Sequence, residues 1–239
     1  KAGNVNDELE ITEDKILYAN YTINNYTVTF DENGGNEVSD LSRDYNATYG
    51  ILPETSKTGY IFNGWCFAET DNNGTGTLAN KDDVVTSSHT LYANWTPITY
   101  TVKYDGNGST SGTMTDDTFT YDVSSQLKEN AYERKYTVTF SNEGGSAVSD
   151  VTCTYSFTNW MLNGTSTTYA DKDTVTNLAS TNGAEVTLDA QWNCTQKAKL
   201  PSAEKTGYTF EGWYYDDEYS SKAGNVNDEL EITEDKILY

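Results

Sequence analysis

The stretch YTVTFDENGG, which begins at Tyr26, carries the pattern that decides the fold. Its first half is β-branched and aromatic, which favours a strand, and its second half is rich in Asn and Gly, which favour a tight turn. Related stretches begin at Tyr100 (YTVKYDGNGS) and at Tyr136 (YTVTFSNEGG). We call this pattern the opening motif, and we expect a strand followed by a turn at each copy.

Two further motifs recur. The middle motif reads LPETSKTGYIFNGW at 52–65 and LPSAEKTGYTFEGW at 200–213, identical at 9 of 14 positions, with a shorter relative, YSFTNW, at 155–160. The closing motif reads LYANWT at 91–96, and its relatives are LDAQWN at 188–193 and LYANYT at 17–22. These runs predict further strands, so the chain is expected to be β-rich.

A longer repeat encloses the short ones. Residues 1–18 recur unchanged at 222–239, an offset of 222 − 1 = 221 residues. The order of motifs then makes 1–22 the closing segment of a preceding module, and 26–96 the most complete module. We therefore predict that 222–239 completes the last module and that 1–22 lies outside the core of 26–96.

The middle of the chain is ambiguous because two opening motifs follow one another there. Residues 99–192 form either one divergent module with an extra hairpin or an outer module with an inner one, 136–192, inserted into it. The last module, 197–239, shows only middle and closing motifs, and in the second reading residues 100–135 complete it. For helices the best candidates are single turns at 44–51 and 121–129.

Charge excludes several classes of function. With 15 Lys and Arg against 37 Asp and Glu, the net charge is −22, whereas nucleic acids and anionic membrane surfaces require a basic face. No apolar run is long enough for a membrane helix, so no membrane insertion is expected within this segment. The chain starts at Lys1 without Met, and we expect a segment of a longer protein.

We predict no catalytic residue, no metal site and no cofactor. His89 is the only histidine and has no recognisable partners for a triad or a zinc site. The acidic turn strings that start at Asp31, Asp71 and Asp105 lack the complete spacing of a calcium loop. Of the three cysteines, Cys153 and Cys194 are the pair that a disulfide would join in an extracellular protein, and Cys66 is not expected to form a disulfide.

Five tryptophans sit in the recurring motifs: Trp65, Trp95, Trp160, Trp192 and Trp213. Tryptophans at equivalent places in small modules are expected to be core residues, because a small sheet needs large side chains to bury. The alternative is an exposed platform on which the face of a sugar ring stacks. Burial of Trp65, Trp95 and Trp213 would decide between the two.

The co-linear series of opening, middle and closing motifs, most faithful at 26–96, resembles the Listeria–Bacteroides repeat, also called the internalin B-repeat, of large bacterial surface proteins. The resemblance implies a β-rich α+β fold: tandem small β-grasp (ubiquitin-like) modules, each a mixed four-stranded sheet with at most a short helix. It also implies an extracellular, cell-surface location and a stalk or spacer role, and it carries over no catalytic residues.

Two functions follow as expectations. The first is a structural tandem-repeat segment of a large extracellular surface protein, a stalk, spacer or fibre-forming unit with a 221-residue super-repeat, whose partners are neighbouring copies arranged head to tail. The second is an adhesin module that binds a host glycan or protein. An enzyme is not expected.

Overall fold

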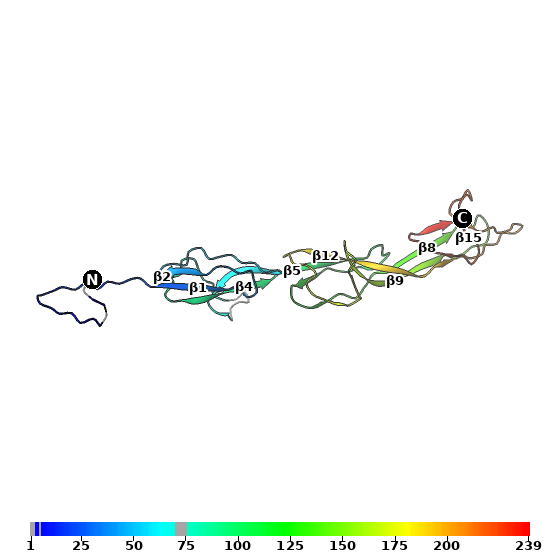
Figure 1. Ribbon diagram of the computed structural model, residues 1–239. Coiled ribbons are helices and arrows are strands. Elements are labelled where there is room, and N and C mark those ends of the chain that lie inside the picture. Colours follow the sequence, from blue (N-terminus) through cyan, green and yellow to red (C-terminus); the bar gives the residue numbers. More distant parts are fainter. Residues whose placement is uncertain (1–2, 5, 70–75) are drawn as a thin grey trace. The chain divides into compact units, whose positions relative to one another are not determined.

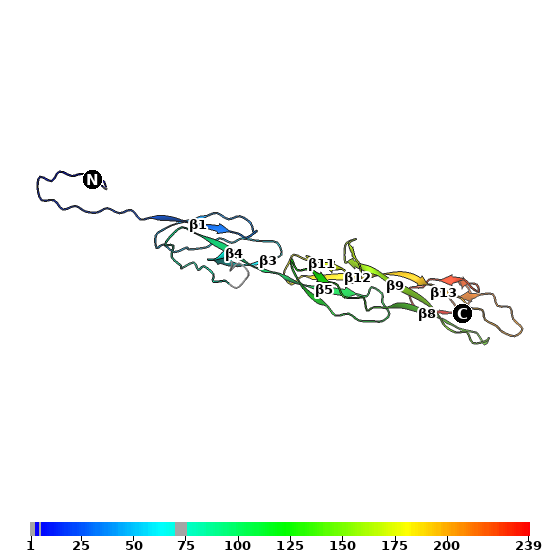
Figure 2. The same ribbon diagram turned by 90° about the horizontal axis from the view of Figure 1, so that it is seen from below.

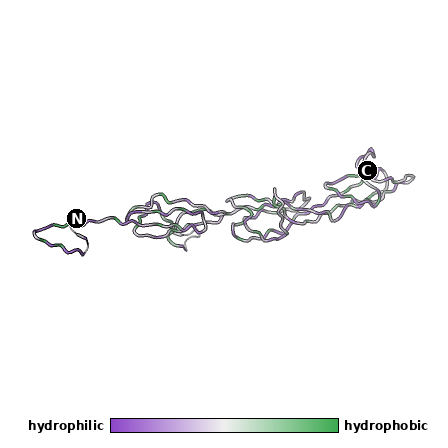
Figure 3. The backbone as a smooth tube through the Cα atoms, viewed as in Figure 1, coloured by the Kyte–Doolittle hydropathy of each residue, from purple (hydrophilic) through white to green (hydrophobic). Residues whose placement is uncertain are grey.

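The computed structural model describes residues 3–4, 6–69 and 76–239. The chain divides into two compact units: unit 1 contains residues 1–57 and 61–96, and unit 2 contains residues 58–60 and 97–239. The described residues form strands, turns and loops without an α-helix, so the β-rich expectation is confirmed. Figure 3 shows hydrophobic and hydrophilic residues interspersed along both units.

Unit 1 is built on a mixed sheet of four strands, shown in Figure 1: β1 (Asn25–Asp31), β2 (Leu41–Asp44), β3 (Tyr60–Cys66) and β4 (His89–Pro97). Their order in the sheet is β2-β1-β4-β3. β1 is antiparallel to β2 and parallel to β4. The three motifs therefore come together, because the opening motif supplies β1, the middle motif β3 and the closing motif β4.

The core of unit 1 lies against this sheet. Val28 of β1 and Leu91 of β4 are fully buried. Trp65 packs on Phe30 with ring centroids 4.5 Å apart, and its indole Nε1 donates a hydrogen bond to the carbonyl oxygen of Pro53. The spacing within the middle motif thus has a physical cause, since the carbonyl oxygen of its second residue accepts a hydrogen bond from the tryptophan that ends it.

Unit 2 contains a larger, seven-stranded sheet. Six of its strands follow the order β17-β8-β9-β12-β5-β6, and β10 pairs with β9 at the side. The strands are β5 (Thr99–Asp105), β6 (Asp117–Thr120), β8 (Arg134–Phe140), β9 (Val151–Leu162), β10 (Thr168–Tyr169), β12 (Glu185–Gln196) and β17 (Lys236–Leu238).

Strand β9 belongs to two halves of this sheet at once. Its first residues, from Val151 to Tyr155, pair antiparallel with β8, and its later residues, up to Leu162, pair antiparallel with β12. β12 is parallel to β5, and β17 is parallel to β8. The opening motif at 100 is therefore paired with the closing motif at 188, and the opening motif at 136 with residues 236–238.

One of the two readings assigns residues 100–135 to the module at 197–239, but β5 and β6 of that segment pair with each other and β5 pairs with β12. The strand beside β17 is β8, with Leu238 opposite Phe140. Strand β9 is long enough to serve both halves, one with each end.

Two hydrophobic clusters fill unit 2, one for each half of the sheet. The first is centred on Trp160 and includes Tyr100, Leu127 and Leu188. The second includes Val138, Leu200, Trp213, Ile232 and Leu238. Trp192 of β12 packs against both clusters, so the two cores meet at this side chain.

Short two-stranded pairings complete unit 2: β7 (Ser125–Gln126) with β11 (Thr174–Val175), β13 (Ala198–Lys199) with β16 (Glu229–Leu230), and β14 (Trp213–Tyr214) with β15 (Lys222–Gly224). The helical turn predicted at 121–129 is wrong, because these residues include strand β7. Residues 44–51 also lack a helix. Leu127 instead enters the first cluster of unit 2.

The identical segments at the two ends have different structures. The described residues from 3 to 24 form no strand, and both Figures 1 and 2 show this segment running away from the sheet of unit 1. Ile11 is 62% exposed, whereas Ile232, the same residue one repeat later, is 4% exposed. Residues 222–239 thus fold into unit 2, as predicted, and residues 3–22 lie outside the core of 26–96.

Candidate functional site

Most tryptophans occupy the core. Trp65, Trp160 and Trp213 are at most 1% exposed, and Trp95 is 4% exposed, while Trp192 is partly buried between the two clusters of unit 2. The core interpretation is confirmed for the three tryptophans chosen to decide it. These indoles therefore offer no sugar ring a face on which to stack.

The same aromatic arrangement recurs in the two units. In unit 1, Phe62 lies between Trp65 and Trp95, with centroids 5.4 and 5.2 Å away. In unit 2, Phe157 lies between Trp160 and Trp192, with centroids 4.9 and 6.0 Å away. In both cases the closing tryptophan is the third and last ring of the series.

The closing tryptophan is also held by the turn of the opening motif. The indole of Trp95 donates to the carbonyl oxygen of Glu32, and the indole of Trp192 donates to that of Gly106. The side-chain amide of the turn asparagine binds the closing strand in return: Asn33 donates to the carbonyl oxygen of Ala93, and Asn107 to that of Ala190. Opening turn and closing strand are thus joined by two hydrogen bonds in each case.

A third copy of the arrangement begins at β8. In it, Trp213 is the counterpart of Trp65 and Phe210 is the counterpart of Phe62. Trp213 packs between Phe140 and Phe210, with centroids 4.4 and 5.1 Å away. Its indole donates to the carbonyl oxygen of Pro201 at 2.8 Å, as that of Trp65 does to Pro53. The residues aligned with the start of LYANWT are Leu238 and Tyr239, the last two residues of the sequence.

A cavity of about 490 Å³ lies at this place in unit 2. Its wall comes from the opening turn, the middle motif and the last residue of the closing segment. The side chains and backbone that line the cavity include those of Asn142, Gly145, Lys205, Phe210, Glu211 and Tyr239. The motifs did not predict this cavity, although the alignment of Leu238 and Tyr239 with the start of LYANWT pointed to this part of the fold.

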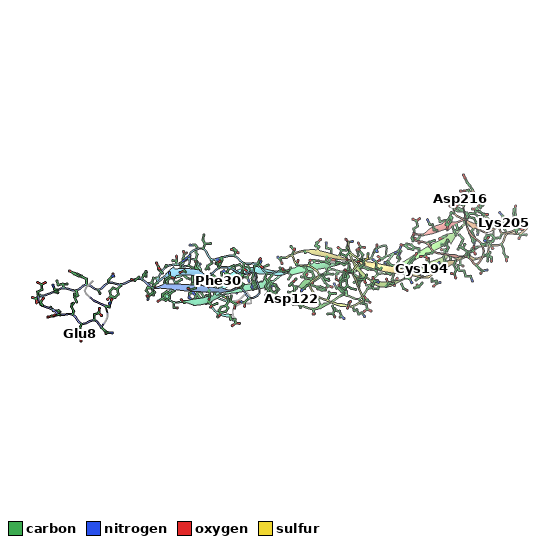
Figure 4. All side chains as sticks on the ribbon, in the orientation of Figure 1. Glu8, Phe30, Asp122, Cys194, Lys205 and Asp216 are labelled. Carbon is green, nitrogen blue, oxygen red and sulfur yellow. The ribbon has the colours of Figure 1, made fainter. Side chains whose placement is uncertain are left out.

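The rim of the cavity combines aromatic and charged groups. Lys205, labelled in Figure 4, donates from Nζ to the carbonyl oxygen of Glu143, and its Nζ lies 4.6 Å from the ring centroid of Tyr208. Tyr208 is 71% exposed. The ring is therefore largely exposed to solvent, and the ammonium group of Lys205 places one positive charge beside it.

The histidine and the acidic turns that were considered as catalytic or metal-binding residues make hydrogen bonds within the fold. The Nε2 atom of His89 lies 2.6 Å from the hydroxyl of Tyr49, and its Nδ1 lies 2.8 Å from the carbonyl oxygen of Ser87. Asp31 and Asp105 each accept the backbone N–H of the residue two positions on, which closes a turn. The string from Asp71 lies outside the described residues. Within the described residues, no three His, Cys, Asp or Glu side chains group as for a metal ion.

The predicted cysteine pair is brought together. The Sγ atoms of Cys153 and Cys194 lie 3.5 Å apart, and both are thiols. Burial, with the neighbouring Cys153, raises the pKa of the Cys194 thiol to about 11. Cys66 is buried elsewhere, in unit 1, with its Sγ near the carbonyl oxygens of Ala68 and Tyr92.

Comparison with known proteins finds relatives among long bacterial proteins. Over 102 residues, 43% of the chain, it is 40% identical to a provisionally named membrane protein of Evansella cellulosilytica. Over 218 residues, 87% of the chain, it is 29% identical to a provisionally named Gly-rich membrane protein of the same organism. The matches span 15% and 23% of the length of these relatives. No solved structure matches.

The described residues contain no helix that is long and apolar enough to cross a membrane. Residues 26–94 and 179–239, more than half of the chain, match the Listeria–Bacteroides repeat domain. The first matched segment contains the opening turn that follows Asp31 and the middle tryptophan Trp65, and the second contains Trp192 and Trp213. The resemblance drawn from the motifs is therefore confirmed: this chain belongs to the Listeria–Bacteroides repeat domain family.

Proposed function

We propose that this chain is a structural tandem-repeat segment of a large extracellular surface protein, in which the repeats act as a stalk or spacer. The observation that carries the proposal is the exact recurrence of residues 1–18 at 222–239 around diverged shorter repeats. Near-identical duplication at a fixed period adds length without adding a new site. The membership in a repeat family and the buried tryptophans support this role.

The fold proposed for each repeat is the β-grasp. Support comes from the order β2-β1-β4-β3, in which an antiparallel hairpin is followed by a closing strand parallel to the first. The order β6-β5-β12-β9 repeats it in unit 2. We infer two interleaved modules there, one from 99–126 with 157–192 and the other from 134–155 with 198–239.

The surface charge fits a spacer. The net charge of −22 keeps neighbouring copies soluble and repels them from one another along an array. The extracellular location that we propose is supported by the family and by relatives that are named as membrane proteins. No enzymatic activity is proposed.

The spacer function is tested by length. Proteins with one, two and three copies of the 221-residue repeat are measured by small-angle X-ray scattering. A spacer predicts that the maximum dimension grows by the same increment with each copy. A dimension that stops growing, because the copies collapse on one another, contradicts it.

The second candidate is an adhesin module, and a specific observation favours it. Tyr208 and Tyr219, which line the cavity of unit 2, are 71% and 50% exposed. Exposed aromatic rings beside a lysine suit the apolar face of a sugar with an anionic group. A glycan array tests this function, with Tyr208→Ala as the matched variant, since loss of binding on that change alone would support it.

A further inference from the structure

We propose that the cavity of unit 2 is a socket for the closing aromatic side chain of a second copy of the repeat, namely Tyr21. The residues Ala19–Thr22 of that copy would continue the strand that ends in Leu238 and Tyr239. The inference rests on the proposed tandem-repeat function and assigns the place where consecutive copies are joined.

The first step is the alignment of the three closing segments. Leu91 and Leu188 are fully buried, and each precedes its tryptophan, Trp95 or Trp192, by four positions. Leu238 is also fully buried and pairs through β17 with the opening strand. An aromatic residue four positions after Leu238 would therefore place its ring in the cavity.

The second step is the identity of that ring. Because residues 1–18 and 222–239 are identical, Leu17 is the counterpart of Leu238. The position four residues after Leu17 is Tyr21, which is 88% exposed. Tyr21 is thus an aromatic side chain that is not buried in a core, and its closing segment, 17–22, forms no strand.

The third step is the match between the cavity and the sockets already filled. Lys57 donates to the carbonyl oxygen of Asn33 beside Trp95, and Lys205 donates to that of Glu143 at the cavity. A Cβ built on Gly35 would meet the ring of Trp95 at 2.7 Å, so a glycine is needed there. Gly145, its counterpart in sequence, lines the cavity. Phe210 stands where Phe62 contacts Trp95.

The fourth step concerns reach and polar partners. Tyr239 itself lines the cavity, and three further extended residues span up to about 10 Å, enough to turn a ring into it. In unit 1 the side chain of Asn63 donates to Asn94 Oδ1 and to Thr96 Oγ1. The counterpart of Asn63 is Glu211, a cavity residue, which can accept hydrogen bonds from Asn20 and Thr22 of the second copy.

The experiment extends the full chain after Tyr239 by Ala-Asn-Tyr-Thr, a copy of residues 19–22. The matched control carries Ala-Asn-Ala-Thr. Hydrogen exchange is followed by mass spectrometry in the peptides that cover 141–145 and 205–214, and the midpoint of urea unfolding is measured. We expect the tyrosine extension to slow exchange there at least tenfold and to raise the midpoint, whereas the alanine control behaves as the unextended chain.

Three outcomes overturn the inference. If neither extension changes exchange, the cavity does not receive the segment. If both extensions slow exchange equally, the added backbone matters and the ring does not. Glycan binding that survives the tyrosine extension would likewise show that the cavity is open to another ligand. The proposed spacer function is judged separately, because constant growth in length can hold while the tyrosine effect is absent.

Discussion

The Sγ atom of Cys153 in β9 lies 3.5 Å from that of Cys194 in β12, and both side chains pack in the second hydrophobic cluster of unit 2. β9 pairs with β8 and with β12, and Trp192, two residues before Cys194, packs against both hydrophobic clusters. A covalent link between the two cysteines would therefore join β9 to the end of β12 beside the second cluster.

We expect oxidised glutathione to convert this pair into a disulfide. The two thiols give up two protons and two electrons, and oxidised glutathione is reduced to two glutathione molecules. Because the bridge restricts the unfolded chain, the free energy of unfolding of unit 2 should rise by about 2–4 kcal/mol. Mass spectrometry without reduction should show one Cys153–Cys194 bridge and Cys66 unbridged. Three alkylatable thiols after oxidation would contradict the prediction, and Cys194→Ser is the control.

The reactivity of Cys194 should depend on pH in an unusual range. Burial raises the pKa of this thiol to about 11, and the hydrogen bond with Cys153 adds to the shift. The thiolate is the reactive form, so alkylation by iodoacetamide should increase as the pH rises through about 11 and be slow near neutral pH. Cys153→Ser measures how much of the shift is due to the neighbouring thiol. A profile with its midpoint near 9 in the unchanged protein would refute the prediction.

The two copies of one isoleucine should respond oppositely to the same change. Ile232 is 4% exposed in the second cluster of unit 2, whereas Ile11 is 62% exposed. Ile232→Asp places a carboxylate in an apolar core and should cost about 3 kcal/mol or more of the free energy of unfolding. Ile11→Asp should change it by less than about 0.5 kcal/mol. Equal effects in urea unfolding would mean that the two segments are equally packed.

The strands of the motifs were predictable, but their partners were not. The opening motif at Tyr136 has the local signals of the one at Tyr100, and both form strands. Nothing local states that Leu238 lies opposite Phe140, since that register depends on contacts far apart in sequence. The predicted helix at 121–129 is wrong for a related reason. Val123 and Leu127 are four positions apart, as on one face of a helix, but Leu127 is buried in the first cluster of unit 2.

The cavity of unit 2 shows the same limit. The alignment of Leu238 and Tyr239 with the start of the closing motif could be read from the sequence. The cavity between Asn142, Phe210 and Tyr239 could not, because it depends on the packing of three segments that are distant in sequence. Burial of Trp65, by contrast, was predictable from the sequence, because a small sheet has few other large side chains to bury.

Calcium should leave the stability of the protein unchanged. The carboxylates of Asp31 and Asp105 bind backbone N–H groups within their own turns. We expect the temperature midpoint of unfolding to differ by less than about 3 °C between calcium and chelator, well below the effect of a specifically bound ion. A shift above about 10 °C, beyond a surface-charge effect of about 1 kcal/mol, would reveal a site.

Finally, the interleaving of unit 2 predicts that its two halves unfold together. Leu238 is fully buried in the second cluster, and Leu238→Ala should cost about 2–5 kcal/mol. Because β9 and β12 extend into the first cluster, that loss should also accelerate hydrogen exchange in β5 and β6, which Leu238 does not contact through strand pairing. Ile237→Ala is the control, since Ile237 is 56% exposed. Faster exchange confined to residues 198–239 would mean that the halves are energetically independent despite their shared strand.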